Sequence, residues 1–96
     1  MIYVWSDWEG VLAIWDARGI RREHASSAVK LTFSTGDVVI YFPDSRRRWK
    51  ARHVEGSNVQ IRQGCIQGPG RFVDSVAVPQ ATGVTIDAWN VDHIPD

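Results

Sequence analysis

The fold is decided by the stretch VKLTFSTGDVVIYF, residues 29–42, in which two apolar strand patterns flank a glycine. In its first half apolar and polar residues alternate, which is the period of a strand with one buried face. A two-residue loop at Thr35 and Gly36 would place Leu31 opposite Ile40. The pairs on either side would be Phe33 with Val38 and Val29 with Phe42. All three pairs are apolar, so the pattern predicts a β-hairpin.

Turn-forming residues recur along the rest of the chain, at residues 43–45, 55–58, 64–70 and 79–83. Strands are expected between them, over residues 46–54, 59–63, 72–78 and 84–89. Sequential pairing would place Arg52 opposite Arg62 and Val78 opposite Val84. The chain therefore reads as all-β, a small antiparallel barrel or sandwich of about eight short strands.

The segment that follows the first strand allows two structures. Ser6 with Glu9 matches a capping box, which favours a helix over about residues 7–18 and an α+β fold with that helix on an antiparallel sheet. The continuous apolar run at residues 11–15 instead favours a strand, with a type I turn at residues 16–19 closed by glycine. We favour the hairpin and keep the helix as the alternative.

Composition bounds the class of protein. The 96 residues suit a single domain spanning 1–96, and the formal net charge is zero, which weakens any general attraction to nucleic acid. Cys65 is the only cysteine, which favours a reducing compartment, and we expect a cytoplasmic protein. No apolar run approaches the length of a membrane-spanning helix, so we expect no membrane association.

The most distinctive surface signal is a basic strand at residues 46–54, which holds five of the 11 Lys and Arg. Side chains alternate between the faces of a strand. One face would therefore present Arg46, Arg48, Lys50 and Arg52. Trp49 would lie on the other face, with Arg47, Ala51 and His53.

This basic strand, extended by Arg62, is the candidate binding site. Its guanidinium groups can contact phosphates or carboxylates, and an accessible Trp49 could stack on a base. The alternative is a solvated strand face with Trp49 in the core, its charges paired with the acidic ends of the chain. The partner expected from this pattern is an acidic protein surface or nucleic acid.

A non-catalytic interaction module is the expected function, because no nucleophile, metal-ligand or cofactor motif is evident. We accordingly expect no enzyme activity, no metal and no cofactor. The alternative is a small-molecule-binding β-domain or minor enzyme with an aromatic-lined pocket. That pocket would be formed by Trp5, Trp8 and Trp89, with Asp7, Glu9 or a histidine as its polar group.

Self-association is the last expectation. A chain of this size with five tryptophans has little interior in which to bury every large side chain. A homodimer with a two-fold interface is the commonest solution.

Overall fold

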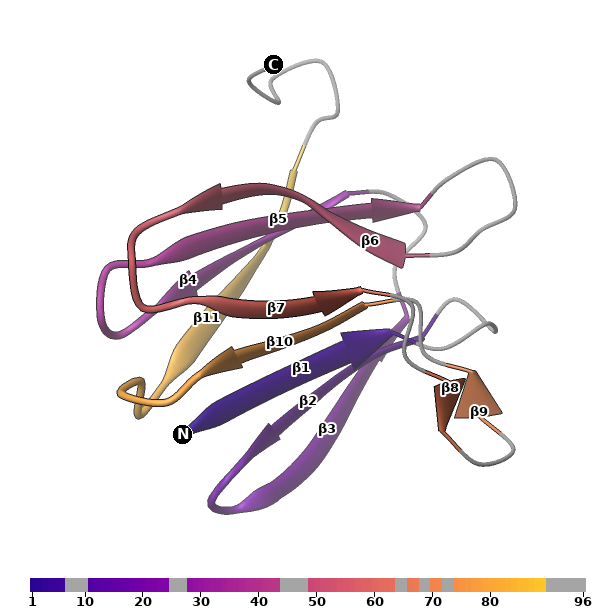
Figure 1. The fold of residues 1–96 in the computed structure, drawn as a ribbon, viewed down its shortest axis with the longest axis horizontal. Coiled ribbons are helices and arrows are strands. Elements are labelled where there is room, and N and C mark those ends of the chain that lie inside the picture. The colour runs from indigo at the N-terminus through magenta and orange to yellow at the C-terminus, as the bar shows by residue number, and fades with distance from the viewer. Residues whose placement is uncertain are drawn as a thin grey trace.

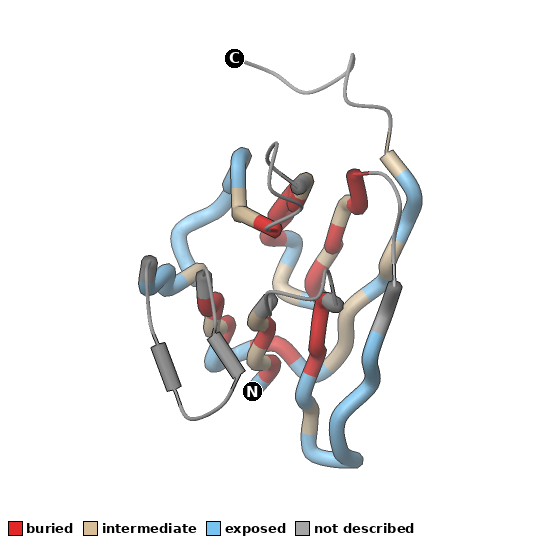
Figure 2. Tube along the Cα trace, turned by 90° about the vertical axis from the view of Figure 1, so that its right-hand side faces the viewer, coloured by how far each residue is buried: buried red, intermediate tan, exposed pale blue. Residues whose placement is uncertain are grey.

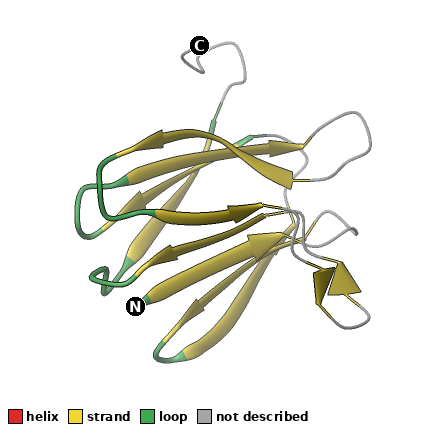
Figure 3. Ribbon diagram, in the orientation of Figure 1, coloured by secondary structure: helices red, strands yellow, loops and turns green. Residues whose placement is uncertain are grey.

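The computed structural model describes residues 1–6, 11–24, 28–43, 49–63, 66–67, 70–71 and 74–89. Two antiparallel sheets pack against each other, and all regular structure in the described residues is strand (Figure 1, Figure 3). The expected all-β fold is confirmed. It is an open sandwich rather than a closed barrel.

The first sheet has five strands in the order β3-β2-β1-β10-β7. Their bounds are Gly19–His24 for β3, Val11–Asp16 for β2, Ile2–Ser6 for β1, Asp74–Val78 for β10 and Gln60–Gln63 for β7. Strand β1 lies at the centre of this sheet, between β2 and β10 (Figure 1). The sheet thus joins the first strand of the chain to strands from its second half.

The second sheet has four strands in the order β11-β4-β5-β6. Their bounds are Val84–Ala88 for β11, Val29–Phe33 for β4, Val38–Pro43 for β5 and Trp49–Glu55 for β6. A separate pair of two-residue strands, β8 (Ile66–Gln67) and β9 (Gly70–Arg71), occupies the segment for which the sequence predicts only a loop.

The core lies between the facing sheets and is built from alternate residues of their strands (Figure 2). The five-stranded sheet contributes Ile2, Val4, Leu12, Ile14, Val76 and Val78. The four-stranded sheet contributes Val29, Leu31, Phe33, Val39, Tyr41 and Trp49. Burial of this apolar set is the main stabilising contribution to the fold.

The hairpin favoured for the ambiguous segment is confirmed. Strands β2 and β3 pair through Asp16 opposite Gly19, and Gly19 has the positive φ of 134° that closes the turn. The Asp16 side chain accepts a hydrogen bond from the backbone N–H of Arg18 at 2.7 Å. The alternative helix therefore does not form over residues 11–18, while residues 7–10 lie outside the described part of the chain.

The hairpin at residues 29–42 exists, but its predicted register is wrong by one residue. Leu31 pairs with Val39 and Lys30 with Ile40. The loop has three residues rather than two, because Phe33 donates a backbone hydrogen bond to the Asp37 carbonyl at 2.9 Å and Gly36 takes a φ of 88°. Strand β5 is buried on both faces, so apolar residues face either way and the pattern alone does not fix the register.

Two other predicted pairings are also wrong. Arg52 does not face Arg62, because β6 pairs with β5 and β7 pairs with β10 in the other sheet. Val78 does not face Val84, because β10 pairs with β1 while β11 pairs with β4. Both connections cross from one sheet to the other, as the sandwich requires (Figure 1).

A buried carboxylate joins two loops at one end of the sandwich. Asp37 is 2% exposed and accepts hydrogen bonds from the backbone N–H and the side-chain amide of Asn58, at 3.2 and 3.1 Å. The Thr35 hydroxyl also donates to it. Asp37 therefore fixes the β4–β5 loop against the β6–β7 connection.

Candidate functional site

The second half of the basic strand predicted over residues 46–54 is confirmed as β6, the edge strand of the four-stranded sheet. Arg46 and Arg48 lie outside the described residues. Lys50 is half-buried and Arg52 is exposed. Among the strands that the structure describes, β6 pairs only with β5, and charged side chains on such an edge discourage pairing with another sheet.

A β-bulge interrupts β6 and changes the predicted alternation. Ile40 pairs with His53 and the next residue, Tyr41, pairs with Ala51, which leaves Arg52 without a partner in β5. Strict alternation predicts that His53 and Ala51 share the inner face. Because of the bulge, they do not. The bulge gives Arg52 a position of its own on the outer side of the sheet.

Two cations lie over aromatic rings on this outer face. The Arg52 guanidinium is 5.0 Å from the centre of the Phe42 ring, and Phe42 is the cross-strand partner of Lys50. The Lys30 ammonium nitrogen is 4.7 Å from the centre of the Trp89 ring. We call the following five residues the basic-aromatic cluster: Lys30, Phe42, Lys50, Arg52 and Trp89. Such contacts hold long side chains in place while their charges stay available to an anion.

The charge of this outer face is not uniform. Glu55, at the far end of β6, lies 3.0 Å from the His53 ring nitrogen Nε2. Asp87 is the cross-strand partner of Lys30. From Lys50 to Glu55 the strand extends about 16 Å, so Glu55 is well separated from the start of β6. Lys50 and Arg52 therefore lie away from Glu55 along β6, whereas Lys30 has the carboxylate residue Asp87 opposite it.

The structure separates the remaining predicted site residues. Trp49 is 1% exposed and belongs to the core, so its ring is not available for stacking on a base. Arg62 is exposed but pairs with Ser75 in the five-stranded sheet. The single face proposed for Arg52 and Arg62 therefore does not exist.

An aromatic face on the five-stranded sheet was missed by the sequence analysis. Its residues alternate with the core residues Val4 and Ile14 and so point away from the core. One cross-strand row, from β7 to β3, is Gln60, Ala77, Tyr3, Trp15 and Ile20. The next row is Arg62, Ser75, Trp5, Ala13 and Arg22. We call these two rows the aromatic face.

The aromatic face exposes large apolar side chains. Trp15 is 38% exposed and Ile20 is 55% exposed, while Tyr3 and Trp5 are half-buried. The Tyr3 and Trp5 rings meet edge to face, with centres 6.1 Å apart. The signal that could have found this face is the alternation in β1, where the aromatic residues Tyr3 and Trp5 alternate with the core residues Ile2 and Val4.

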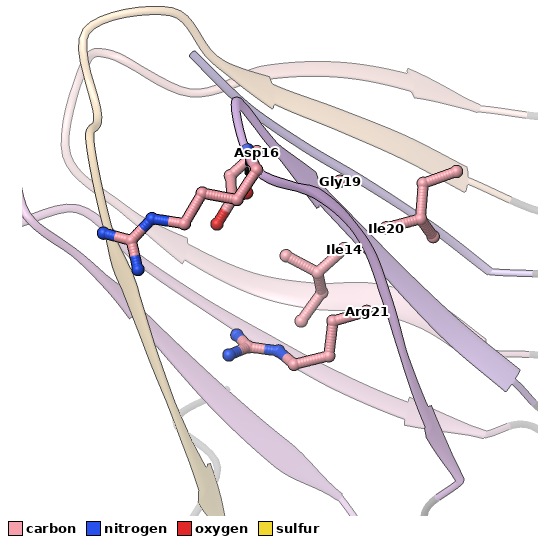
Figure 4. A pocket seen from close by; sticks show the side chains of 6 residues that line it. Ile14, Asp16, Gly19, Ile20 and Arg21 are labelled. Carbon is pink, nitrogen blue, oxygen red and sulfur yellow. Dashed lines mark hydrogen bonds between the residues drawn. The ribbon is translucent and has the colours of Figure 1, made fainter.

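A shallow, open depression of about 260 Å³ lies beside the β2–β3 turn. It is lined by Ile14, Asp16, Arg18, Gly19, Ile20 and Arg21. Figure 4 shows the Ile14 and Arg21 side chains directed into the same space, with Ile20 on the opposite side of its strand. The lining holds no aromatic ring, so it differs from the pocket that the sequence suggests.

The described residues do not form the aromatic-lined pocket of the alternative reading. Trp8, Asp7 and Glu9 lie outside the described residues. Trp5 points outward from the five-stranded sheet, and Trp89 lies with Lys30 on the outer side of the four-stranded sheet. These two rings therefore do not line one cavity. The described part of the chain also contains no group of three or more His, Cys, Asp or Glu that could hold a metal ion.

Asp37 is the carboxylate whose pKa is clearly perturbed among the described groups. The Thr35 hydroxyl contributes most to lowering the pKa of Asp37 below its usual value, burial opposes it, and the Asn58 donors lower it further. All three effects come from loop contacts at the end of the sandwich. The same contacts that lower the pKa hold the two loops together.

Comparisons with protein-family models, curated proteins and solved structures found no significant match to this chain. Within the described residues, no helix is long and apolar enough to cross a membrane. Any functional conclusion therefore rests on the surfaces described above.

Proposed function

We propose that this protein is a non-catalytic interaction module that contacts an acidic protein surface or nucleic acid through its basic-aromatic cluster. The observation that carries the proposal is the position of Arg52, which is displaced by the bulge and lies over the Phe42 ring. A guanidinium held in this way keeps its donors directed outward, ready for bidentate contacts to phosphate or carboxylate. A cytoplasmic location, expected from the lone cysteine, belongs to the same proposal.

Neighbouring charges support an anionic partner. Lys50 is the cross-strand partner of Phe42, and Lys30 lies over Trp89 on the same face. Arg46 and Arg48, outside the described residues, immediately precede this strand. A partner that neutralises these cations gains affinity from counterion release, without requiring a pocket.

The alternative function, a small-molecule binder or minor enzyme, has weaker support. It calls for an enclosed pocket with aromatic walls and a few polar groups. The depression beside the β2–β3 turn is open and lined by Ile14, Arg18 and other non-aromatic residues. Flat outer faces are better suited to a macromolecule than to a small ligand.

The test measures binding of the whole chain to a single-stranded oligonucleotide and to poly-glutamate at several salt concentrations. For the oligonucleotide, the slope of log affinity against log salt should be about −0.7 per phosphate contacted. The double variant Lys50→Ala with Arg52→Ala should flatten that slope by about 1.4 and weaken poly-glutamate binding. Arg18→Ala, an exposed arginine in the β2–β3 turn, is the matched control and should leave both unchanged.

Two results would contradict the proposal. The first is no binding of either polyanion at about 50 mM salt, where electrostatic attraction is strong. The second is binding that the double variant leaves unchanged. In that case the charges of β6 serve only to protect the sheet edge.

A further inference from the structure

We infer that the aromatic face of the five-stranded sheet is a second binding site, one that takes single-stranded nucleic acid by stacking bases on Trp15, Tyr3 and Trp5. The phosphates of the same strand would contact Arg22 and Arg62. This site is separate from the basic-aromatic cluster, which lies on the outer side of the other sheet. The inference therefore stands independently of the proposed function.

Three aromatic rings lie next to one another on this face. Tyr3 and Trp15 are direct cross-strand partners, so their side chains stand side by side on neighbouring strands about 5 Å apart. Trp5 follows Tyr3 on the same strand and face, with its ring centre 6.1 Å away. Three adjacent rings on a sheet offer stacking positions to successive bases, which single-strand binders use without sequence preference.

Two large side chains of the aromatic face are exposed to solvent. Trp15 is 38% exposed and the neighbouring Ile20 is 55% exposed. Large apolar side chains gathered on one face of a small protein mark an interaction surface more often than single exposed residues do. Their position on strands also holds the rings in fixed relative positions, which lowers the entropy lost on binding.

The charge of the aromatic face favours an anionic partner. Arg22 and Arg62 occupy the two ends of one cross-strand row, four strand spacings or about 19 Å apart. Neither row of the aromatic face contains Asp or Glu. A second copy of this chain packed on the face would bring arginines toward arginines. A strand with flat bases and a negative backbone complements both the rings and the guanidinium groups.

The experiment titrates the whole chain with oligonucleotides of about 12 nucleotides, dT and U, following tryptophan fluorescence and anisotropy. We expect binding with quenching, because a ring stacked on a base loses emission. Trp15→Ala should weaken affinity about 5- to 150-fold, and Trp15→Phe, which retains a stacking ring, should restore most of it. Arg22→Ala with Arg62→Ala should flatten the salt slope by about 1.4.

The controls separate this site from the basic-aromatic cluster. Arg18→Ala tests for general loss of positive charge and should have no effect. If Lys50→Ala with Arg52→Ala abolishes binding while Trp15→Ala does not, the inference fails and the proposed function is supported. If Trp15→Ala abolishes binding while Lys50→Ala with Arg52→Ala does not, the aromatic face is supported as the nucleic-acid site. The basic-aromatic cluster then fails as a site for nucleic acid.

Other outcomes also decide the matter. The absence of oligonucleotide binding at about 50 mM salt would overturn the inference. So would sedimentation showing a dimer that Trp15→Ala converts to monomer, because the face would then be a contact between copies. Circular dichroism must show that Trp15→Ala keeps its strands. If it does not, Trp15→Phe and the Arg22 and Arg62 variants still test the site.

Discussion

Asp37 and Asn58, 21 residues apart in sequence, are joined by two hydrogen bonds of 3.1 and 3.2 Å between separate loops of the sandwich. Their contact links a connection within the four-stranded sheet to the chain that crosses to the five-stranded sheet. A buried carboxylate in such a position stabilises the fold only while it is ionised and its donors remain in place.

Stability should therefore depend on the ionisation of Asp37. Because the pKa of Asp37 is lowered in the folded state, its contribution is fully present above the unfolded value of 3.8 and is lost as the pH falls through the lower folded pKa. Urea unfolding midpoints between about pH 2 and pH 6 measure this loss. Asp37→Asn should lower the urea midpoint at about pH 6. Between about pH 6 and pH 2 its midpoint should then fall less than that of the unmodified protein. An equal fall in both proteins would contradict the stabilising role of the ionised Asp37.

Gly56→Ala should destabilise the protein more than the same change at Gly36. Both glycines have positive φ, 102° and 88°, so alanine costs about 1–2 kcal/mol of backbone strain at either position. At Gly56 the new Cβ would also collide with the Asp37 carboxylate and lie 3.2 Å from its Cα, whereas at Gly36 nothing lies within 4 Å. Thermal melts of the two variants make the comparison, and equal melting temperatures would argue against the loop contact.

Leu31→Ala should cost about 2–5 kcal/mol of unfolding free energy, because Leu31 is 0% exposed at the centre of the core. Ile20→Ala is the control, since Ile20 is 55% exposed and its truncation should cost about 0.5 kcal/mol or less. Denaturant unfolding of both variants provides the measurement. Similar costs at the two positions would show that the inner and outer faces are misassigned.

The contact between Arg52 and Phe42 should appear as a coupling energy. A double-mutant cycle with Arg52→Ala and Phe42→Ala should give about 0.5–1 kcal/mol, the range for cation–π pairs at exposed sites. The cycle of Phe42→Ala with Arg62→Ala serves as control and should give none, because Arg62 lies in the other sheet. Zero coupling in the first cycle would show that the ring does not hold Arg52.

Local patterns predicted the strands well and their partners poorly. The β2–β3 hairpin follows from its own turn, with Asp16 opposite Gly19, so every signal needed lies within a few residues. The register of β4 with β5 is not predictable from the pattern alone, because Val38 and Ile40 on the outer side of β5 are buried as well as Val39 and Tyr41 on its inner side. No local signal distinguishes a strand that turns back on its neighbour from one that crosses to the other sheet.

The candidate surfaces show the same limit. The alternation in β6 correctly predicts that Trp49 and Lys50 point to opposite faces of the sheet. The bulge at Arg52, however, depends on how β5 pairs with β6. Arg62 extends the basic strand only in a β6–β7 hairpin, which the local turn signals predict but which does not form, because the two strands lie in different sheets. The aromatic face spans all five strands of its sheet, and Arg62 joins the rings only because β10 pairs with both β1 and β7. Self-association remains a prediction, and the arginines of the aromatic face argue against that surface as the dimer interface.

The position of β1 between β2 and β10 has a consequence for folding during synthesis on the ribosome. Strands β1, β2 and β3 can pair as soon as they emerge, but the other edge of β1 needs Asp74–Val78. At translation rates of about 5–20 residues per second, the roughly 50 residues between His24 and Asp74 take about 2.5–10 s to synthesise. During that interval the nascent three-stranded sheet presents an unpaired apolar edge, so we expect slow codons between β3 and β10 to increase aggregation or chaperone engagement of the growing chain.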